Sequence, residues 1–372
     1  MIDFYCPINN LGYGVHSYNL LKSLDALGVD FALFPPNNIT DCPDTIVEKW
    51  ISNQKRFNKN DTGVMIFHEQ FMNRFYGKLR IGFPVFELNL LPEDIEKLKT
   101  LDYILQTSEY FKSYLNSLGF NNVFVVPEGF NPEIYNFDDS VMQKKEKLLN
   151  ERGLIFSHIG KMEERKSTLD IVNVFTQALH NSSNKCTLIL NVVNPFLSNW
   201  LELLSNFIYG IEYSKLQEDE STISFVKDNL KIIVLKYKLK NIREIYDSSV
   251  FGLYLSKAEG WNLPLIESIA SGLPCVTTNN TGMSDYLKDY PLEFIVPSGQ
   301  SVLANDGIWF RGDRGNWDSP DLGEAKQILR NIANSPLSYL HKAKDCYKSI
   351  KNFTWEMSAQ KFISVMKRVG GL

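Results

Sequence analysis

Short apolar segments alternate with helix-length amphipathic segments along the chain, and the alternation starts a second time near residue 150. A short apolar run bounded by turn residues is typical of a strand buried on both faces. Where such strands alternate with helices, the chain forms strand-helix-strand units around a parallel sheet. The pattern therefore predicts an α/β protein with two doubly wound, Rossmann-like domains.

Each series has its own set of expected elements. The strands expected in the first series are Ile2–Tyr5, Phe31–Phe34, Val64–Phe67, Arg80–Val85, Tyr103–Gln106 and Val123–Val126. The strands expected in the second series are Leu154–Ile159, Cys186–Val192, Ile232–Leu235, Phe251–Tyr254, Cys275–Thr277 and Phe294–Val296. The helices expected include Gly14–Leu27, Glu93–Thr100, Ser108–Leu118 and Trp355–Val369.

The length of 372 residues also favours two domains, because a single hydrophobic core stops growing at about 250–300 residues. We expect residues 1–150 to form the first domain and residues 151–352 the second. Residues 353–372 are expected to form a helix that packs back on the N-terminal domain.

The composition narrows the class of function. A net charge of −4 and a pI near 5.8 make a nucleic-acid partner unlikely, although a local basic patch stays open. The five cysteines are scattered without metal-ligand spacing and indicate buried thiols in a reducing compartment. The sequence shows no signal segment and no run of about 20 apolar residues, so we expect a cytoplasmic protein, with contact to the inner face of a membrane left open.

The most informative window runs from residue 256 to residue 267 and follows an expected strand. Pro264 suits the first turn of a helix, and a helix that begins after a parallel strand presents free N–H groups to an anion. Glu259 and Glu267 flank this anion site. A carboxylate repels phosphate but accepts hydrogen bonds from hydroxyls, so we interpret the two acids as contacts to the sugars on either side of a diphosphate.

A second window, residues 157–167, follows the first strand of the second series. Gly160 would permit a sharp turn, and Lys161, Arg165 and Lys166 place cations at the carboxyl end of that strand. Such cations would stabilise the negative charge that develops on a leaving diphosphate.

A third window contains Gly12 and Gly14, which would let the backbone approach a phosphate or a sugar closely. The window lacks the third glycine and the following acidic residue of a dinucleotide fingerprint, so nicotinamide binding is disfavoured.

Taken together, the windows resemble glycosyltransferase family 4, the retaining enzymes of the GT-B fold. The resemblance runs through most of the chain, and its motifs are Gly12–Gly14, 126–132, Gly160 to Lys166, Glu259 to Glu267, and 353–356. It implies two Rossmann-like domains that face a central cleft, and transfer of a sugar from a nucleotide-sugar donor to an acceptor hydroxyl with retention of configuration. A role in glycan or glycoconjugate biosynthesis follows from the same resemblance.

The resemblance also implies roles for single residues. Glu259, Lys166 and Arg165 are the expected catalytic residues. The expected donor-binding residues are Gly12, Gly14, Gly160, Lys161, Gly260, Trp261, Asn262, Leu263 and Glu267. Among these, Glu267 should hold the ribose, and the amides around Asn262 should complete the anion site.

No cofactor and no metal are expected, because the chain has no Asp-x-Asp triplet and its cations and helix N-terminus can balance a diphosphate. His68 and Glu87 are candidates for the acceptor side. The donor can be a UDP-, GDP- or ADP-sugar, and the acceptor stays undetermined. A GT-B epimerase or phosphorylase, or a catalytically silent sugar-nucleotide-binding scaffold protein, remains an alternative.

Overall fold

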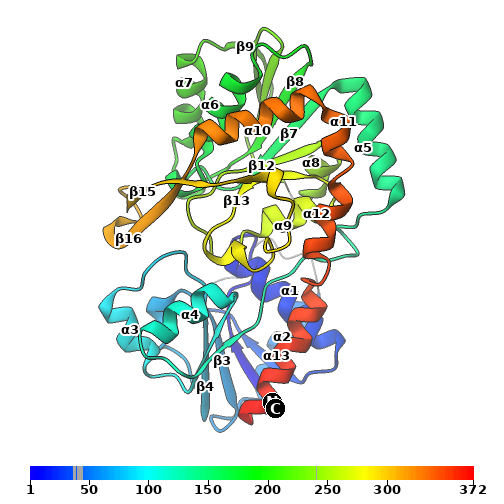
Figure 1. Cartoon of the computed structure of the whole chain (residues 1–372). Helices are drawn as coiled ribbons and strands as arrows, with labels where there is room; N and C mark the ends of the chain where they lie inside the picture. Colours follow the sequence, from blue (N-terminus) through cyan, green and yellow to red (C-terminus); the bar gives the residue numbers. More distant parts are fainter. Residues whose placement is uncertain (37–38, 40–44, 240) are drawn as a thin grey trace.

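The computed structural model describes residues 1–36, 39, 45–239 and 241–372, and it shows an α/β chain in two halves stacked one above the other (Figure 1). Cys42 lies outside the described residues. The other four cysteines, Cys6, Cys186, Cys275 and Cys346, are buried and free, as the sequence predicts for thiols.

The lower half in Figure 1 is built on a six-stranded parallel sheet in the order β2-β1-β3-β4-β5-β6. Its elements are β1 (Ile2–Tyr5), α1 (Gly12–Ala26), β2 (Phe31–Phe34), α2 (Ile46–Ser52), η1 (Asn53–Arg56), β3 (Thr62–Phe67), η2 (Glu69–Phe71), β4 (Leu79–Pro84), α3 (Pro92–Leu98), β5 (Tyr103–Gln106), α4 (Glu109–Ser117) and β6 (Val123–Val125). All six strands coincide with expected ones, because their apolar side chains are buried in this sheet.

The upper half contains an eight-stranded sheet in the order β14-β13-β12-β7-β8-β11-β10-β9. Its strands are β7 (Leu154–Ile159), β8 (Cys186–Asn191), β9 (Ser214–Glu218), β10 (Thr222–Lys227), β11 (Leu230–Leu235), β12 (Phe251–Tyr254), β13 (Cys275–Thr278) and β14 (Ile295–Val296). Six of them are parallel, and β10 and β9 continue the edge in antiparallel pairing. The fold class expected from the sequence is thus confirmed, with an antiparallel edge that it did not predict.

The helical segments of the upper half connect and cover these strands. They are α5 (Asp139–Arg152), η3 (Glu164–Lys166), α6 (Thr168–Leu179), α7 (Trp200–Gly210), α8 (Arg243–Asp247), α9 (Leu263–Ala270), η4 (Thr281–Ser284), η5 (Leu292–Phe294), α10 (Leu322–Asn334), α11 (Pro336–Leu340) and α12 (Ala343–Ile350). A separate two-stranded hairpin, β15 (Ser298–Asn305) and β16 (Arg311–Pro320), projects from this half (Figure 1).

Helix α5 accompanies the second sheet, although the expected division at residue 150 assigns it to the first segment. The helix contacts β7 and α11. Its buried Lys145 donates hydrogen bonds to the backbone carbonyls of Tyr246 and Ser249, the latter at 2.7 Å. These buried contacts hold the helix to residues about 100 positions further along the chain. The boundary between the two halves therefore lies before α5 rather than at the expected residue 150.

The last helix, α13 (Trp355–Val369), returns to the lower half and lies beside α1 (Figure 1). The rings of Phe4 and Phe362 are 5.6 Å apart. Where the chain crosses back, Phe130 and Thr354 form a parallel bridge, and a Cβ atom at Gly129 would lie 2.3 Å from the backbone of Thr354. The two crossing segments therefore touch each other directly.

Candidate donor site at the cleft between the two sheets

The loop after β7 is fixed at the carboxyl edge of the second sheet. The amides of Gly160 and Met162 donate to the carbonyls of Asn191 and Val192 at the end of β8, at 3.1 and 2.9 Å. The short helix η3 follows, and Ser167 with a φ of 53° turns the chain into α6. Arg165 and Lys166 therefore lie on a loop that is anchored at both ends.

The loop after β12 is fixed in a comparable way. The hydroxyl of Thr281 accepts from the amide of Glu259 at 2.8 Å and lies 2.9 Å from its carbonyl oxygen. Asn262 adopts a left-handed conformation with a φ of 73°, and α9 begins at the next residue. The expected order of strand, loop and helix N-terminus is present.

The two loops meet in buried ion pairs. One carboxylate oxygen of Glu259 lies 2.8 Å from Arg165 Nη1, and the other lies 2.5 Å from Lys166 Nζ. All three side chains are at most 10% exposed. The structure thus brings together the three residues that the sequence predicts to be catalytic.

These pairs shift the pKa values of all three groups. Burial opposes the charge of Glu259, but Lys166 and Arg165 outweigh it and lower its pKa to about 2. Burial also lowers the pKa of Lys166, and Glu259 offsets part of that effect. The pKa of Arg165 is raised, because Glu259, Glu87 and Glu163 together outweigh burial. The carboxylate is therefore ionised at neutral pH and holds the guanidinium in its charged form.

Two further carboxylates surround Arg165. Its Nη2 atom lies 3.2 Å from Glu163 and 3.3 Å from Glu87, a residue of the other half of the chain. Lys161 pairs with Glu163 at 2.6 Å. Glu87, expected on the acceptor side, therefore faces the candidate donor cations across the boundary between the two sheets.

Glu267 lies in α9 apart from this network and is 7% exposed. Burial raises its pKa to about 8, although a hydrogen bond with Tyr246, at 3.4 Å, acts in the opposite direction. The carboxyl group is therefore mainly protonated at neutral pH, when it can donate as well as accept a hydrogen bond.

The expected glycines differ in their steric surroundings. A Cβ atom at Gly260 would lie 2.6 Å from Cγ1 of Val85 in the other half, so the two halves approach closely here. Gly12 and Gly14 lie within the first turn of α1, and Gly14 is packed against Asn9. Helix α1 therefore begins two residues earlier than the expected start at Gly14 and includes both glycines.

Gly160 departs from the expectation of a sharp turn. Its φ is outside the left-handed region, and a Cβ atom there would meet nothing closer than 3.7 Å. The backbone in this structure therefore does not require glycine at position 160.

Two of the expected donor-binding side chains are occupied by packing. Trp261 is 2% exposed, and its ring packs at a tilt against those of Tyr286 and Phe353, with centroid distances of 5.0 and 5.6 Å; Leu263 is 9% exposed. Asn262 is also buried and its amide contacts Met283 Sδ at 3.4 Å. Only backbone groups of Trp261 and Leu263 are thus suited to the predicted role.

His68 is exposed at the end of β3, and its Nδ1 atom lies 3.1 Å from the hydroxyl of Tyr13. That hydroxyl also donates to the carbonyl of Val85. The structure therefore places His68 beside the N-terminal turn of α1, and it shows no direct contact of His68 with Glu259 in the described part of the chain.

Sequence reasoning missed two polar pairs near this network. Lys257, two residues before Glu259, pairs with Glu164 of the facing loop. His16 Nδ1 lies 2.8 Å from Glu128 Oε1, and both side chains are buried. The partners are about 93 and 112 positions apart in the sequence, so local patterns could not indicate these two pairs.

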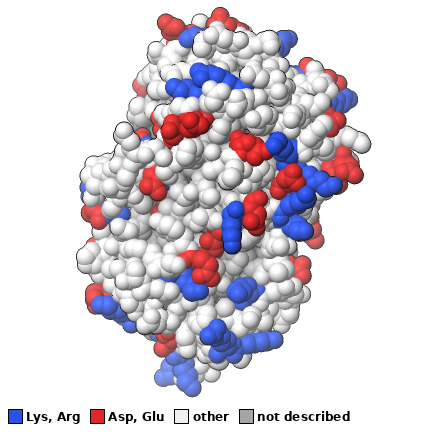
Figure 2. Space-filling view, viewed as in Figure 1, with Lys and Arg blue, Asp and Glu red and all other residues white. Residues whose placement is uncertain are grey.

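Charged side chains of both signs are interspersed on the face shown in Figure 2. Within residues 1–36, 39, 45–239 and 241–372, no group of three His, Cys, Asp or Glu side chains is arranged to hold a metal ion. None of the helices described by the structure has the length and apolarity to cross a bilayer.

Comparison with known protein families gives a match to part of the chain. Residues 142–308 match the family model of the glycosyl transferases group 1. This segment contains both loops of the ion-pair network, so the match confirms the resemblance that the motifs indicate. Among curated proteins, none matches the chain in sequence.

Solved structures with the same fold cover nearly all of the chain. A sucrose-phosphate synthase from Thermosynechococcus elongatus aligns over 99% of this chain and 98% of its own, with a TM-score of 0.66 and 12% identity. The trehalose-6-phosphate synthase OtsA aligns over 99% of both chains, with a TM-score of 0.66 and 14% identity. HepE of Anabaena, solved in complex with UDP-glucose, aligns over 99% of both chains, with a TM-score of 0.60 and 12% identity. The chain therefore has the GT-B fold.

Proposed function

We propose that the protein is a glycosyltransferase that moves a sugar from a nucleotide-sugar donor to an acceptor hydroxyl, with retention of configuration. The observation that carries this proposal is the buried network of Glu259, Arg165 and Lys166 at the carboxyl ends of two parallel strands. The match of the surrounding segment to the glycosyl transferases group 1 supports it. We assign the reaction to glycan or glycoconjugate biosynthesis.

The network suits the chemistry of a leaving diphosphate. Departure of the nucleoside diphosphate increases negative charge beside the sugar, and fixed cations stabilise that charge more than they stabilise the ground state. Arg165 and Lys166 are held in place by Glu259 before any donor binds, so little reorganisation is needed. Glu259 then contacts the transferred sugar through its carboxylate oxygens.

Glu267 and the helix N-terminus complete the proposed donor site. The protonated carboxyl group of Glu267 can both donate to and accept from the ribose hydroxyls. At the N-terminus of α9, the amide of Leu263 is the donor proposed for a phosphate, since Pro264 has no amide proton and the amide of Leu265 donates to the carbonyl of Asn262. Glu87 and His68 are assigned to the acceptor side of the cleft.

For the donor nucleotide we propose UDP first, because HepE was solved with UDP-glucose. GDP- and ADP-sugars are the other candidates. Arg165, Lys166 and the N-terminus of α9 supply positive charge for the diphosphate, so we propose that transfer needs no divalent metal and proceeds in EDTA.

The first experiment is a thermal-shift screen of UDP-, GDP- and ADP-sugars in EDTA. The wild-type protein is compared with Glu267→Ala/Lys166→Ala. The control is Glu96→Ala/Lys99→Ala, which removes an exposed ion pair in the other half. One nucleotide class should raise the melting temperature of the wild type and the control but not of the site variant, since a ligand that binds the native state stabilises it.

A transfer assay with the selected donor separates the alternative activities. A glycosyltransferase releases the nucleoside diphosphate and forms a glycoside, whose configuration is read by NMR. Phosphorolysis with phosphate, or conversion of the donor to an epimer, would instead indicate a related GT-B enzyme. Donor binding without transfer or hydrolysis across a panel of acceptors would contradict the proposal and favour a silent scaffold protein.

A further inference from the structure

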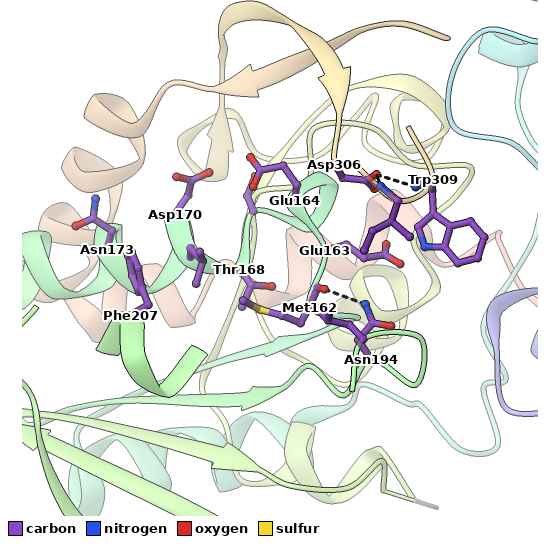
Figure 3. A pocket seen from close by; sticks show the side chains of 14 residues that line it. Met162, Glu163, Glu164, Thr168, Asp170, Asn173, Asn194, Phe207, Asp306 and Trp309 are labelled. Atoms are coloured by element: carbon purple, nitrogen blue, oxygen red, sulfur yellow. Dashed lines mark hydrogen bonds between the residues drawn. The ribbon is translucent and has the colours of Figure 1, made fainter. Parts of the chain in front are cut away.

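A cavity of about 390 Å³ lies beside the loop that carries Arg165 and Lys166, but Glu259 and Glu267 do not line it. It is bounded by the start of α6, by α7 and by the turn of the β15–β16 hairpin. In Figure 3, Asp306 and Trp309 of the hairpin stand at one end, and Asn173 and Phe207 stand at the other. The volume falls within the range of about 300–1,000 Å³ that is usual for small-molecule pockets.

The acidic side chains that line this cavity disfavour the binding of an anion. Glu163, Glu164, Asp170 and Asp306 line it, and an ionised carboxylate can only accept hydrogen bonds. None of the described lining residues is a lysine or an arginine. The cavity therefore differs chemically from the adjoining site, whose cations suit a diphosphate.

Three of these carboxylates have close partners and the fourth, Asp170, lies 4.0 Å from Lys257 Nζ, which argues against a bound cation. Glu163 lies 2.6 Å from Lys161 and 3.2 Å from Arg165, and Glu164 pairs with Lys257. Asp306 accepts the three consecutive backbone amides of residues 308–310 at 2.8 to 2.9 Å. Since these charges are compensated, the carboxylate oxygens can accept hydrogen bonds from the hydroxyls of an uncharged ligand.

An aromatic wall stands beside these acceptors. Trp309 is 52% exposed, and its ring meets Phe196 edge to face at a centroid distance of 5.4 Å. A half-exposed indole offers an apolar surface to C–H groups and a polar N–H at its edge. Ser167, a residue that is 3% exposed, also lines the cavity.

We propose that this cavity binds an uncharged saccharide at a site separate from the donor site. A pyranose combines an apolar C–H face for Trp309 with hydroxyl donors for Asp170 and Glu163. Glu163 lines the cavity and also pairs with Arg165, so an occupant lies within one side chain of the proposed catalytic network. The inference rests on the cavity alone, so it can fail while the proposed function holds.

Fluorescence offers a direct test, because Trp309 is the exposed tryptophan of the six in the chain. The other five, Trp50, Trp200, Trp261, Trp317 and Trp355, are at most 7% exposed. Quenching by acrylamide should therefore report mainly on Trp309. We expect glucose, N-acetylglucosamine or maltotriose to protect this fluorescence in a saturable manner, and Trp309→Phe should remove the quenchable component.

Asp170→Asn should raise the dissociation constant of the saccharide that protects Trp309 by at least about tenfold, which is equivalent to about 1.4 kcal/mol. Asn173→Ala is a second variant on the same wall and tests the site should Asp170→Asn not fold. Asp289→Asn, at an exposed position in the same half, is the matched control and should leave protection unchanged. Thermal shifts by the UDP-sugar, measured on the same variants, report the donor site independently.

Protection that is kept in Asp289→Asn and lost in Asp170→Asn or Asn173→Ala supports a saccharide site in this cavity. Absence of protection by all three saccharides overturns the proposal. Equal protection in the wild type and both wall variants also overturns it, since the saccharide would then bind elsewhere.

Discussion

Glu259 is a buried acid whose ionised form depends on its two cationic neighbours. Burial alone would raise its pKa, yet Lys166 and Arg165 hold the pKa near 2. If Glu259 were removed, Arg165 would keep Glu163 and Glu87 as partners, whereas Lys166 would lose its 2.5 Å contact. The stability of the loop and the chemistry of the site are thus linked through one side chain.

We predict that Glu259→Gln lowers the free energy of unfolding by about 3 kcal/mol and transfer activity by more than about tenfold. Removal of one partner from a buried ion pair costs about 3–5 kcal/mol, because the remaining charge stays buried without compensation. Urea denaturation measures the loss, with the exposed Glu96→Gln as control. A variant as stable as the control would show that Lys166 finds another partner.

The pH dependence of stability should report on Glu267. Its pKa is raised from 4.5 to about 8 by burial, so the unfolded chain releases this proton at lower pH than the folded chain. The stabilising effect is therefore complete below pH 4.5 and is lost as the pH rises through 8. Each unit of pKa difference corresponds to about 1.4 kcal/mol.

We accordingly expect Glu267→Gln to gain stability relative to the wild type between pH 4.5 and 8. The exposed Glu133→Gln should follow the wild-type profile. Denaturation curves at several pH values measure the difference. Parallel profiles for Glu267→Gln and the wild type would mean that the carboxyl group is not protonated in the folded protein at neutral pH.

At the scale of elements, the β15–β16 hairpin links the two halves. Arg314 in β16 lies 2.8 Å from Glu69 and 3.5 Å from Asp94, two buried acids of the lower half. Trp317 in the same strand lies beneath the ammonium group of Lys257 at 5.7 Å. The hairpin therefore contacts both the lower half and the loop that carries Glu259.

We predict that Arg314→Ala destabilises the protein by about 1–3 kcal/mol, the usual cost of leaving a buried polar group without its partner. Glu69 should then bind a proton more readily, because Arg314 lowers its pKa against the effect of burial. Calorimetry at pH 7 measures the loss. Arg311→Ala, at an exposed position of the same strand, is the control. Equal stability of the two variants would show that the hairpin does not join the halves energetically.

The sequence predicted the buried parallel strands of both sheets, because full burial produces short apolar runs that stand out from the helices. It did not predict the hairpin, since β15 is mostly exposed and shows no clear alternation of apolar and polar residues. It also misplaced α5. The contact of Lys145 with Ser249 depends on tertiary packing, which the local sequence does not predict.

For the candidate site too, the sequence predicted what depends on strand and loop positions and missed what depends on tertiary packing. Motif spacing predicted that Glu259, Arg165 and Lys166 lie at one sheet edge, because strand ends fix the positions of loops. Motif spacing could not predict that Glu163 and Glu87 contact Arg165, because these contacts depend on how the side chains pack between the two halves.

At the scale of the whole molecule, one apolar cluster contains buried residues of both halves, and polar contacts also cross the boundary between the two sheets. The hydroxyl of Thr107, at the end of β5, donates to the carbonyl of Gly260 at 2.8 Å, and Thr107 is 1% exposed. The amide of Glu109 donates to Asp285 at 2.9 Å. The first contact joins the lower sheet directly to the loop that bears Glu259, so unfolding of one half should disturb the other.

We predict that Thr107→Val lowers the free energy of unfolding by about 1–3 kcal/mol, because the buried carbonyl of Gly260 loses its donor while the side-chain volume is kept. The calorimetric transition should also broaden or divide, since the halves lose part of their coupling. Thr100→Val is the matched control, as its hydroxyl donates to the carbonyl of Lys97 at 2.7 Å within one half and at the surface. An unchanged single transition in Thr107→Val would mean that the shared apolar cluster, the crossing segments and the hairpin make the two halves unfold together without this hydrogen bond.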